Sequence, residues 1–141
     1  MSTRISFSES CVPPKTSHHA KRIIRVKGHA RLGDKPELTA AKSFWDALFL
    51  QHRPATPLVG PLLLWITLTW PWNTSDSKKT RANGWVYHDT APDVDNMTKT
   101  LMDSMARCAY FNRDSQVACL QIDKYRGDNP GIEVTLGELS P

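Results

Sequence analysis

The sequence predicts a small α/β (α+β) domain in which a mixed β-sheet packs against two main helices. Its 141 residues suffice for one domain, residues 1–141, with a single core. The chain is 40% hydrophobic and 23% charged, as in soluble globular domains. Segments of period-two alternation are interspersed with segments of helical period. Their order along the chain is strand, short strand, helix, strand, helix, strand, strand.

The N-terminal half carries the patterns of two strands, a helix and a central strand. Residues 3–8 alternate apolar and polar side chains, which predicts the first strand. The basic segment 21–31 contains enough isoleucine and valine for a short second strand. Pro36–Gln51 predicts a helix, because proline suits the first turn and apolar residues recur at helical spacing. Leu62–Trp70 lies in an uncharged stretch interrupted by prolines, so we expect a buried strand rather than a membrane-spanning helix.

The C-terminal half is expected to contain a long loop, a helix and a β-hairpin. Asn73–Asp89 is polar and contains Gly84, which is typical of a solvated loop that could carry binding function. Asp95–Arg107 has its apolar side chains on one helical face. Val117–Tyr125 and Gly131–Leu136 have the pattern of strands, and we expect them to pair with each other around the intervening turn.

The cysteines, Cys11, Cys108 and Cys119, are odd in number and widely spaced. This pattern favours neither a disulfide framework nor a structural zinc site. The polar N-terminus does not resemble a signal peptide, so we expect a cytoplasmic protein with no membrane partner. The sequence contains no glycine-rich phosphate-binding motif, so no nucleotide cofactor is expected.

Charge is distributed unevenly along the chain, whose net charge is +4. Residues 1–35 contain eight basic and two acidic side chains, whereas residues 91–141 contain five basic and eight acidic ones. This distribution indicates a polyanion held next to a carboxylate-bearing site; the alternative is a chance asymmetry on a solvated surface. The basic side chains expected to contact phosphates are Lys15, Lys21, Arg22, Lys78, Lys79 and Arg81.

Aromatic side chains in the polar loop offer a second kind of contact with nucleic acid. Trp85 and Tyr87 are candidates for stacking on bases, whereas Trp65, Trp70 and Trp72 are expected to fill the core.

Three aspartates form the candidate metal site. Asp93 and Asp95 are two residues apart on a segment expected to be extended, so their side chains should point the same way. Asp114 could join them if residues 108–114 are extended, because ~3.3 Å per residue suffices to retrace a helix of ~18 Å. Three neighbouring carboxylates repel one another unless a cation is present, and oxygen ligands suit Mg²⁺ or Mn²⁺. Such a site beside a basic surface is typical of a phosphodiesterase.

The same residues have a purely structural alternative. An aspartate before an apolar-periodic segment is an ordinary helix N-cap. Lys99 lies four residues from both Asp95 and Asp103, a spacing typical of surface ion pairs.

Two motifs carry a family resemblance. They are Asp93-x-Asp95-Asn96-x-x-Lys99-x-x-x-Asp103 and Asp114-Ser115-Gln116-Val117, followed by Lys124 ahead of Gly131-Ile132. With the opening strand and its Pro13-Pro14-Lys15 turn, they resemble the RusA-type Holliday junction resolvases of bacteria and their phages. The element order is similar over nearly the whole chain, and the specific motifs lie within residues 92–124.

The resemblance implies a role for each matching residue. Asp93, Asp95 and Asp114 match the metal-binding carboxylates of the family, and Lys99 matches its essential lysine. Lys124 is expected to contact DNA. The family acts as a homodimer on four-way DNA junctions with Mg²⁺ or Mn²⁺, and twofold symmetry suits paired nicks.

The chain departs from the family pattern at two positions. Arg113 stands where members commonly have an acid, and Ala91 stands where a basic residue is common. Arg113 removes the acid that could serve as a fourth ligand, and Ala91 removes one basic side chain that could contact a phosphate.

The sequence therefore predicts a Mg²⁺-dependent, structure-selective endodeoxyribonuclease that resolves four-way (Holliday) junctions by paired phosphodiester hydrolysis. One alternative is a non-catalytic branched-DNA-binding module on the same scaffold, which Arg113 favours. Another is a basic structural protein whose acids cap a helix.

Overall fold

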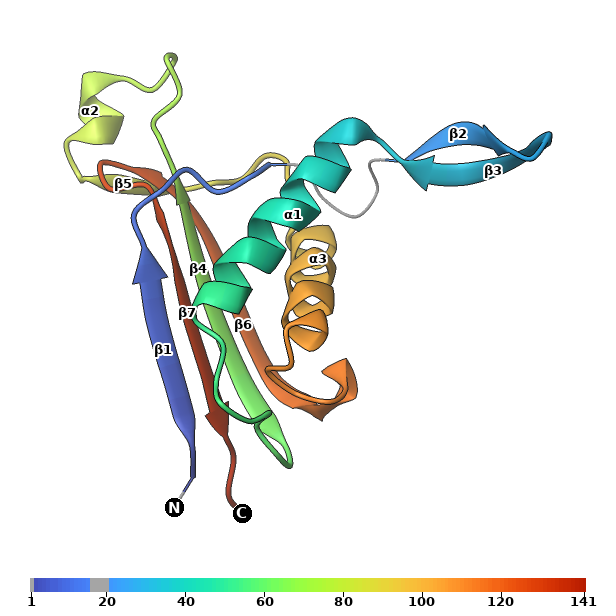
Figure 1. Ribbon diagram of the computed structural model, residues 1–141. Coiled ribbons are helices and arrows are strands. Elements are labelled where there is room, and N and C mark those ends of the chain that lie inside the picture. The colour runs from blue at the N-terminus through green and yellow to red at the C-terminus, as the bar shows by residue number, and fades with distance from the viewer. Residues whose placement is uncertain (1, 16–20) are drawn as a thin grey trace.

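The computed structural model describes residues 2–15 and 21–141, with the main chain alone at Lys21. A five-stranded mixed sheet is covered on one face by two long helices (Figure 1). This confirms the predicted α/β (α+β) class. In spatial order the strands are β1 (Arg4–Glu9), β7 (Gly131–Glu138), β4 (Leu62–Trp70), β6 (Val117–Gly127) and β5 (Trp85–Tyr87).

Strand β4 occupies the centre of the sheet. It is parallel to β6 and antiparallel to β7, and the outer pairs β1–β7 and β5–β6 are antiparallel. Every second side chain of β4 is buried, from Leu62 to Trp70. The alternation arises because successive side chains of a strand point to opposite faces, so one face of β4 lies against the helices.

The predicted hairpin of the two C-terminal strands is wrong. β6 and β7 do not pair with each other, because β4 lies between them and is hydrogen-bonded to both. The physical reason is that β4 is an uncharged nine-residue strand, and the central position pairs it along both edges. The local turn signal at residues 128–130 specifies a reversal of direction but not which strand is the neighbour.

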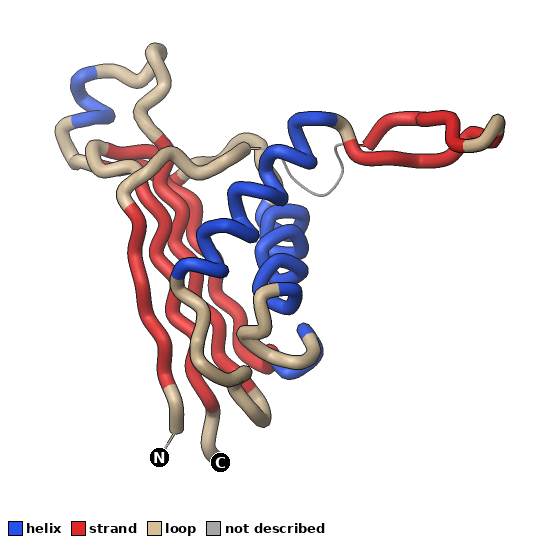
Figure 2. Tube along the Cα trace, in the orientation of Figure 1, coloured by secondary structure: helices blue, strands red, loops and turns tan. Residues whose placement is uncertain are grey.

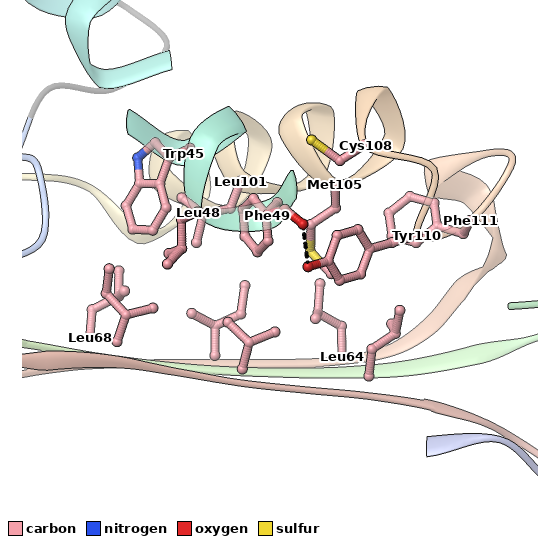
Figure 3. Close-up of a cluster of buried hydrophobic side chains, with 14 of the residues drawn as sticks. Trp45, Leu48, Phe49, Leu64, Leu68, Leu101, Met105, Cys108, Tyr110 and Phe111 are labelled. Atoms are coloured by element: carbon pink, nitrogen blue, oxygen red, sulfur yellow. Dashed lines mark hydrogen bonds between the residues drawn. The ribbon is translucent and has the colours of Figure 1, made fainter. Parts of the chain in front are cut away.

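The two long helices, α1 (Pro36–Gln51) and α3 (Val94–Arg107), lie on the same face of the sheet (Figure 2). Their buried side chains meet those of β4 and β7 in one hydrophobic core, part of which Figure 3 shows. Within that core, the Tyr110 hydroxyl donates a 2.7 Å hydrogen bond to the Phe49 carbonyl oxygen. Burial raises the pKa of Tyr110, so this hydroxyl keeps its proton and remains a donor.

A polar link joins the two helices outside the core. The Asp46 carboxylate of α1 accepts hydrogen bonds from the Ser104 hydroxyl and from the guanidinium of Arg107, both on α3. One carboxylate therefore fixes the position of α3 along α1.

The basic segment near the N-terminus forms a separate two-stranded antiparallel hairpin of β2 (Lys21–Val26) and β3 (His29–Asp34). Its two-residue turn has positive φ at both central positions, +52° at Lys27 and +79° at Gly28. Such a turn matches the twist of the flanking strands. The hairpin projects away from the sheet and helices (Figure 1).

The segment Asn73–Asp89 is more ordered than the predicted loop. It contains the short helix α2 (Lys78–Arg81) and the edge strand β5. A buried ion pair between Asp76 and Arg126 ties it to β6, with a 2.9 Å contact between Asp76 Oδ1 and Arg126 Nη2. Polar residues thus fix this segment through specific bonds that hydrophobic periodicity does not reveal.

The face of the sheet opposite the helices is not covered by any other described element. Trp65 lies on it and is 46% exposed, so its predicted place in the core is wrong, whereas Trp70 is buried as expected. The alternation of β4 explains the difference, because positions 65 and 70 have opposite parity. Among the described helices, none is long and apolar enough to span a membrane.

Candidate active site

An open groove of about 890 Å³ lies between α3 and β6. Helix α3 contributes Val94, Asp95, Thr98, Lys99, Met102 and Asp103; Asp114 and the β6 residues Leu120, Gln121 and Ile122 complete the lining. Two of the three candidate metal ligands and the candidate lysine therefore share one surface depression. Its lining combines apolar and charged side chains, which makes it the first candidate for substrate binding.

The expected extended segment through Asp93 and Asp95 is wrong, because α3 begins at Val94. Asp93 is the N-cap residue and Asp95 already belongs to the first helical turn. Their side chains therefore do not share a direction by strand alternation. Asp95 lines the groove, whereas Asp93 is not part of its lining.

Asp93 does not act as a capping side chain. It occupies the N-cap position, yet its carboxylate makes no capping hydrogen bond to the helix backbone. It accepts a long hydrogen bond, of 3.5 Å, from the Asn96 side-chain amide. The carboxylate is exposed, and its oxygens remain available to an external ligand.

Asp114 reaches the groove by a different path from the one expected. The connection after α3 is not extended: Ala109 has φ +62°, and Phe111 forms an isolated bridge with Leu58. Asp114 then begins the 3₁₀ turn η1 (Asp114–Gln116) that leads into β6. This connection follows the C-terminal end of α3 (Figure 1), whereas Asp93 is the N-cap residue at the other end of that helix.

The three carboxylates therefore do not form one compact cluster. Across residues 2–15 and 21–141, no group of three or more acidic, histidine or cysteine side chains is placed to hold a metal ion. The donor set nevertheless suits Mg²⁺, which is commonly bound by one or two carboxylates together with waters and substrate phosphates. Asp95 and Asp114 are exposed, and neither carboxylate has a hydrogen-bond or ion-pair partner among the described residues.

Lys99 projects from the middle of α3 into the same groove. The structural alternative requires ion pairs with Asp95 and Asp103, but in the described part of the chain Lys99 makes no salt bridge within 4.0 Å. Its ammonium group is exposed and available to a substrate anion.

Lys124 has a structural role that the sequence did not suggest. Its ammonium group donates to the carbonyl oxygens of Thr90 and Pro92, at 2.7 and 2.6 Å. Burial lowers the pKa of Lys124, and the carboxylates of Asp93 and Asp89 oppose that shift. Two of its three N–H donors thus fix the segment before Asp93, which makes Lys124 a positioning residue rather than a free phosphate contact.

Gln116 is a structural anchor beside the groove whose bonds the sequence analysis did not predict. Its side-chain oxygen accepts from the backbone N–H groups of Asn112 and Arg113, at 3.0 and 3.1 Å. Its side-chain nitrogen donates to the carbonyl oxygens of Leu58 and Gly60. One amide therefore fastens the turn that carries Asp114 to the loop before β4. The signal was present as the glutamine of the Asp-Ser-Gln motif.

The predicted phosphate contacts fall into two groups. The side chains that are exposed, and so accessible to DNA, are Lys15, Arg22, Lys78 and Lys79. Arg81 instead donates to the carbonyl oxygens of Asp76 and Asn73, at 3.0 and 2.8 Å, and lies over the Trp72 ring. The prediction for the Lys21 side chain falls outside what the structure describes.

A buried histidine lies beside the segment that Lys124 holds. His88 is 5% exposed and packs edge-on against Trp70. Burial lowers the pKa of His88, and the positive charges of Lys124, Arg126 and Lys15 lower it further, against the opposing effect of Asp89. The imidazole is therefore neutral near pH 7.

The aromatic stacking candidates lie away from the groove. Trp85 and Tyr87 of β5 form a cluster with Tyr125 of β6, with ring centroids 5.1–5.3 Å apart. Tyr125 pairs with Thr69, which points away from the helices because the adjacent Trp70 points toward them. The cluster therefore belongs to the open face of the sheet.

Comparison with known proteins agrees with this architecture. Residues 12–137 match the family model described as endodeoxyribonuclease RusA. The chain is 30% identical over 118 residues to the uncharacterized protein YqaN of Bacillus subtilis strain 168, covering 80% of this chain and 82% of that protein. It is 24% identical over 124 residues to the crossover junction endodeoxyribonuclease rusA of Lactococcus phage r1t, covering 88% and 90%.

The fold and the groove define a small α+β protein with an acidic and basic surface site beside a mixed sheet. Because the family model matches well over half of the sequence, the chain belongs to the RusA family of endodeoxyribonucleases.

Proposed function

We propose that this protein is a Mg²⁺-dependent endonuclease that resolves four-way DNA junctions by paired cuts. Family membership supports nuclease activity, and the phage relative is named for crossover junction cleavage. One structural observation carries the proposal. Asp95, Asp114 and Lys99 line a single open groove, and none is engaged in a salt bridge among the described residues.

The carboxylates of Asp95 and Asp114, which share the groove, would hold the divalent ion, with Mn²⁺ as a substitute for Mg²⁺. Asp93, outside the groove lining, is proposed as a third ligand because it matches the family motif. When bound, such an ion supplies an activated water and stabilises charge on the transferring phosphate. The protein's own part is to present exposed carboxylates, of which only Asp93 accepts a side-chain hydrogen bond among the described residues, the 3.5 Å one from Asn96. Their exposure leaves room for phosphate oxygens as the remaining ligands.

Lys99 would act on the scissile phosphate itself. A lysine ammonium is a compact charge on a flexible stem, and Lys99 lines the groove proposed to receive the DNA. Charge increases on the phosphate as the reaction proceeds, so a fixed cation stabilises the transition state more than the ground state.

Paired cleavage implies two active sites related by twofold symmetry. A four-way junction has such symmetry, and a homodimer presents the same surface twice. We therefore propose a homodimer as the active species, with one groove directed at each of two opposing strands.

A second candidate function is junction binding without cleavage. It is favoured by the absence of a compact three-carboxylate cluster in the described residues and by Arg113 at a position commonly acidic in the family. It would use the same basic surfaces and would not depend on the carboxylates.

Cleavage of a labelled four-way junction separates the two candidates. Wild-type protein should cut symmetrically with Mg²⁺ and stop when EDTA is added. The matched duplex should remain intact. The control variant Glu133→Gln changes an exposed carboxylate on the opposite side of the sheet and should cut normally. Junction binding that persists in EDTA, with no product formed in Mg²⁺, would reject the nuclease in favour of the binding module.

A further inference from the structure

The projecting hairpin of β2 and β3, residues 21–34, is called here the basic ribbon. It extends away from the sheet and helices (Figure 1), and among the described strands β2 and β3 pair only with each other. The ion pair between Asp34 and Lys42 connects its base to α1. A two-stranded ribbon has no core of its own and is marginal in isolation, so a surface that it contacts would add to its order.

The ribbon carries the charge of a polyanion-binding element. Its exposed basic side chains are Arg22, Arg25, Lys27 and Arg31, with His29 beside the turn. Asp34 is the single acidic residue of its sequence, and it is engaged with Lys42. The ribbon is therefore complementary to the phosphate backbone of a nucleic acid.

The two faces of the ribbon differ in packing. On one face Ile24 lies over Gly33, where a β-carbon would come within 2.7 Å of the isoleucine side chain. On the other face Ile23 lies directly opposite Leu32. Ile23 and Leu32 are 78% and 68% exposed, the highest values among the large hydrophobic side chains that the structure describes.

An apolar pair of this kind, uncovered and flanked by arginines, needs a partner that is both anionic and apolar. DNA has an anionic phosphate backbone, and it exposes the apolar faces of its bases where they are unstacked or lie at the end of a stack. A two-stranded ribbon fits the major groove, and isoleucine and leucine are among the side chains that wedge between base steps. A four-way junction exposes base-pair faces at its crossover, whereas continuous duplex does not.

We propose that the basic ribbon clamps an arm of branched DNA and places the Ile23–Leu32 pair against the exposed base pairs at the crossover. This inference rests on the proposed junction-resolving function and assigns the ribbon a part in selecting branched over continuous DNA. The arginines supply affinity for any duplex, and the apolar pair supplies the preference for the junction.

The test compares three variants by fluorescence anisotropy with EDTA present, so that no DNA is cut. Ile23→Thr with Leu32→Thr keeps the β-propensity of the ribbon but removes its apolar surface. Arg25→Gln with Arg31→Gln removes charge. Val59→Thr, a 63% exposed position outside the ribbon, is the matched control. Each variant is titrated with a four-way junction and with a duplex of the same arm sequence.

The threonine pair should lower junction affinity at least tenfold and leave duplex affinity within twofold. It should also abolish the fluorescence rise of a 2-aminopurine placed at the crossover. The glutamine pair should weaken both complexes and reduce the salt slope by about 1.8, or about 0.9 for each phosphate that the variant no longer neutralises. Val59→Thr should match the wild type.

Wild-type protein provides an independent measurement. Trypsin cuts after the basic residues of the ribbon, and junction DNA should protect those bonds better than an equal concentration of duplex. An unchanged junction-to-duplex ratio in the threonine pair, or equal protection by both DNAs, overturns the proposal. A change of oligomeric state in the threonine pair would instead assign the ribbon to an interface between copies of the chain. A wild type without any junction preference would reject the proposed function as well.

Discussion

At the scale of single residues, Asp93 separates the structural interpretation of the aspartates, as helix caps, from the proposed role as metal ligands. The residue occupies the N-cap of α3 but makes no capping hydrogen bond. An N-cap that does bond contributes about 0.5–2 kcal/mol to stability. Because that bond is absent here, helix capping does not account for the aspartate side chain at this position.

The first prediction concerns the three candidate metal ligands. Asp93→Asn, Asp95→Asn and Asp114→Asn should each abolish Mg²⁺-dependent junction cleavage. Junction binding should persist or tighten, because removing negative charge reduces repulsion with phosphate. Melting temperatures should stay near the wild-type value, since none of the three carboxylates is held by a described salt bridge. If a variant cuts at the normal rate, the aspartate that it replaces is not a metal ligand.

The second prediction concerns Lys99. Lys99→Ala should leave stability unchanged, because the structure contains no described ion pair for it to lose. Single-turnover cleavage should fall by orders of magnitude, where each factor of ten corresponds to about 1.4 kcal/mol of transition-state stabilisation. Lys99→Arg should rescue only partly, since it keeps the charge but changes its shape. If the alanine variant cleaves at the wild-type rate, Lys99 is a solvated surface residue with no role in cleavage.

At the scale of secondary-structure elements, the sequence pattern of a segment predicts its type and bounds but does not predict which strand it pairs with. The bounds of α1 and β4 follow from their own residues: a first-turn proline with helical periodicity, and an uncharged alternating run. The partner of β6 does not follow from its residues, because it depends on where β4 lies. The same limit applies to Asp114, whose place depends on the bonds of Gln116.

The third prediction concerns the turn η1. Gln116→Leu removes hydrogen bonds to four backbone groups and should cost at least about 1 kcal/mol in urea unfolding. Gln116→Glu keeps the oxygen that accepts from Asn112 and Arg113 but places a second oxygen against the carbonyls of Leu58 and Gly60. It should therefore lower the free energy of unfolding by a similar amount. Both should slow cleavage by displacing Asp114. Ser115→Ala, an exposed neighbour, is the control. Wild-type stability in both variants would remove the proposed fastening role.

The fourth prediction concerns the short helix α2. Lys78→Ala with Lys79→Ala should weaken junction and duplex binding alike, because contacts with phosphates carry no sequence or branch information. The slope of log K against log salt should become shallower by about 0.9 for each phosphate that the variant leaves unneutralised. Arg81→Ala is the contrasting change, since its guanidinium holds main-chain carbonyls and its removal should lower stability. An unchanged slope in the lysine pair excludes α2 from the DNA footprint.

At the scale of the whole molecule, pH acts through His88. Burial and nearby cations lower the pKa of His88, so the unfolded chain binds this proton more readily than the folded chain. The contribution of His88 to stability is therefore complete above its ordinary pKa of about 6.5 and is lost as the pH falls below that value.

The fifth prediction measures this effect. The melting temperature of the wild type should decrease between pH 7.5 and 5.5. His88→Asn, which cannot take up that proton, should show a smaller decrease. His29→Asn, at an exposed position of the basic ribbon, is the matched control and should keep the wild-type dependence. Equal slopes in all three proteins would show that His88 does not govern stability in this range.

The sheet joins the two ends of the described chain, because β1 is hydrogen-bonded to β7 alone. During synthesis β1 emerges before the other described strands, and β7, its partner in the sheet, emerges after all of them. Ile5 and Phe7 of β1 pack against the core in the folded protein. Their strand therefore lacks its hydrogen-bond partner until residues 131–138 have been synthesised. Until then this strand is an unpaired edge that a chaperone or another nascent chain could bind. The five-stranded sheet can therefore be completed only after residues 131–138 have left the ribosome, because β7 lies between β1 and β4.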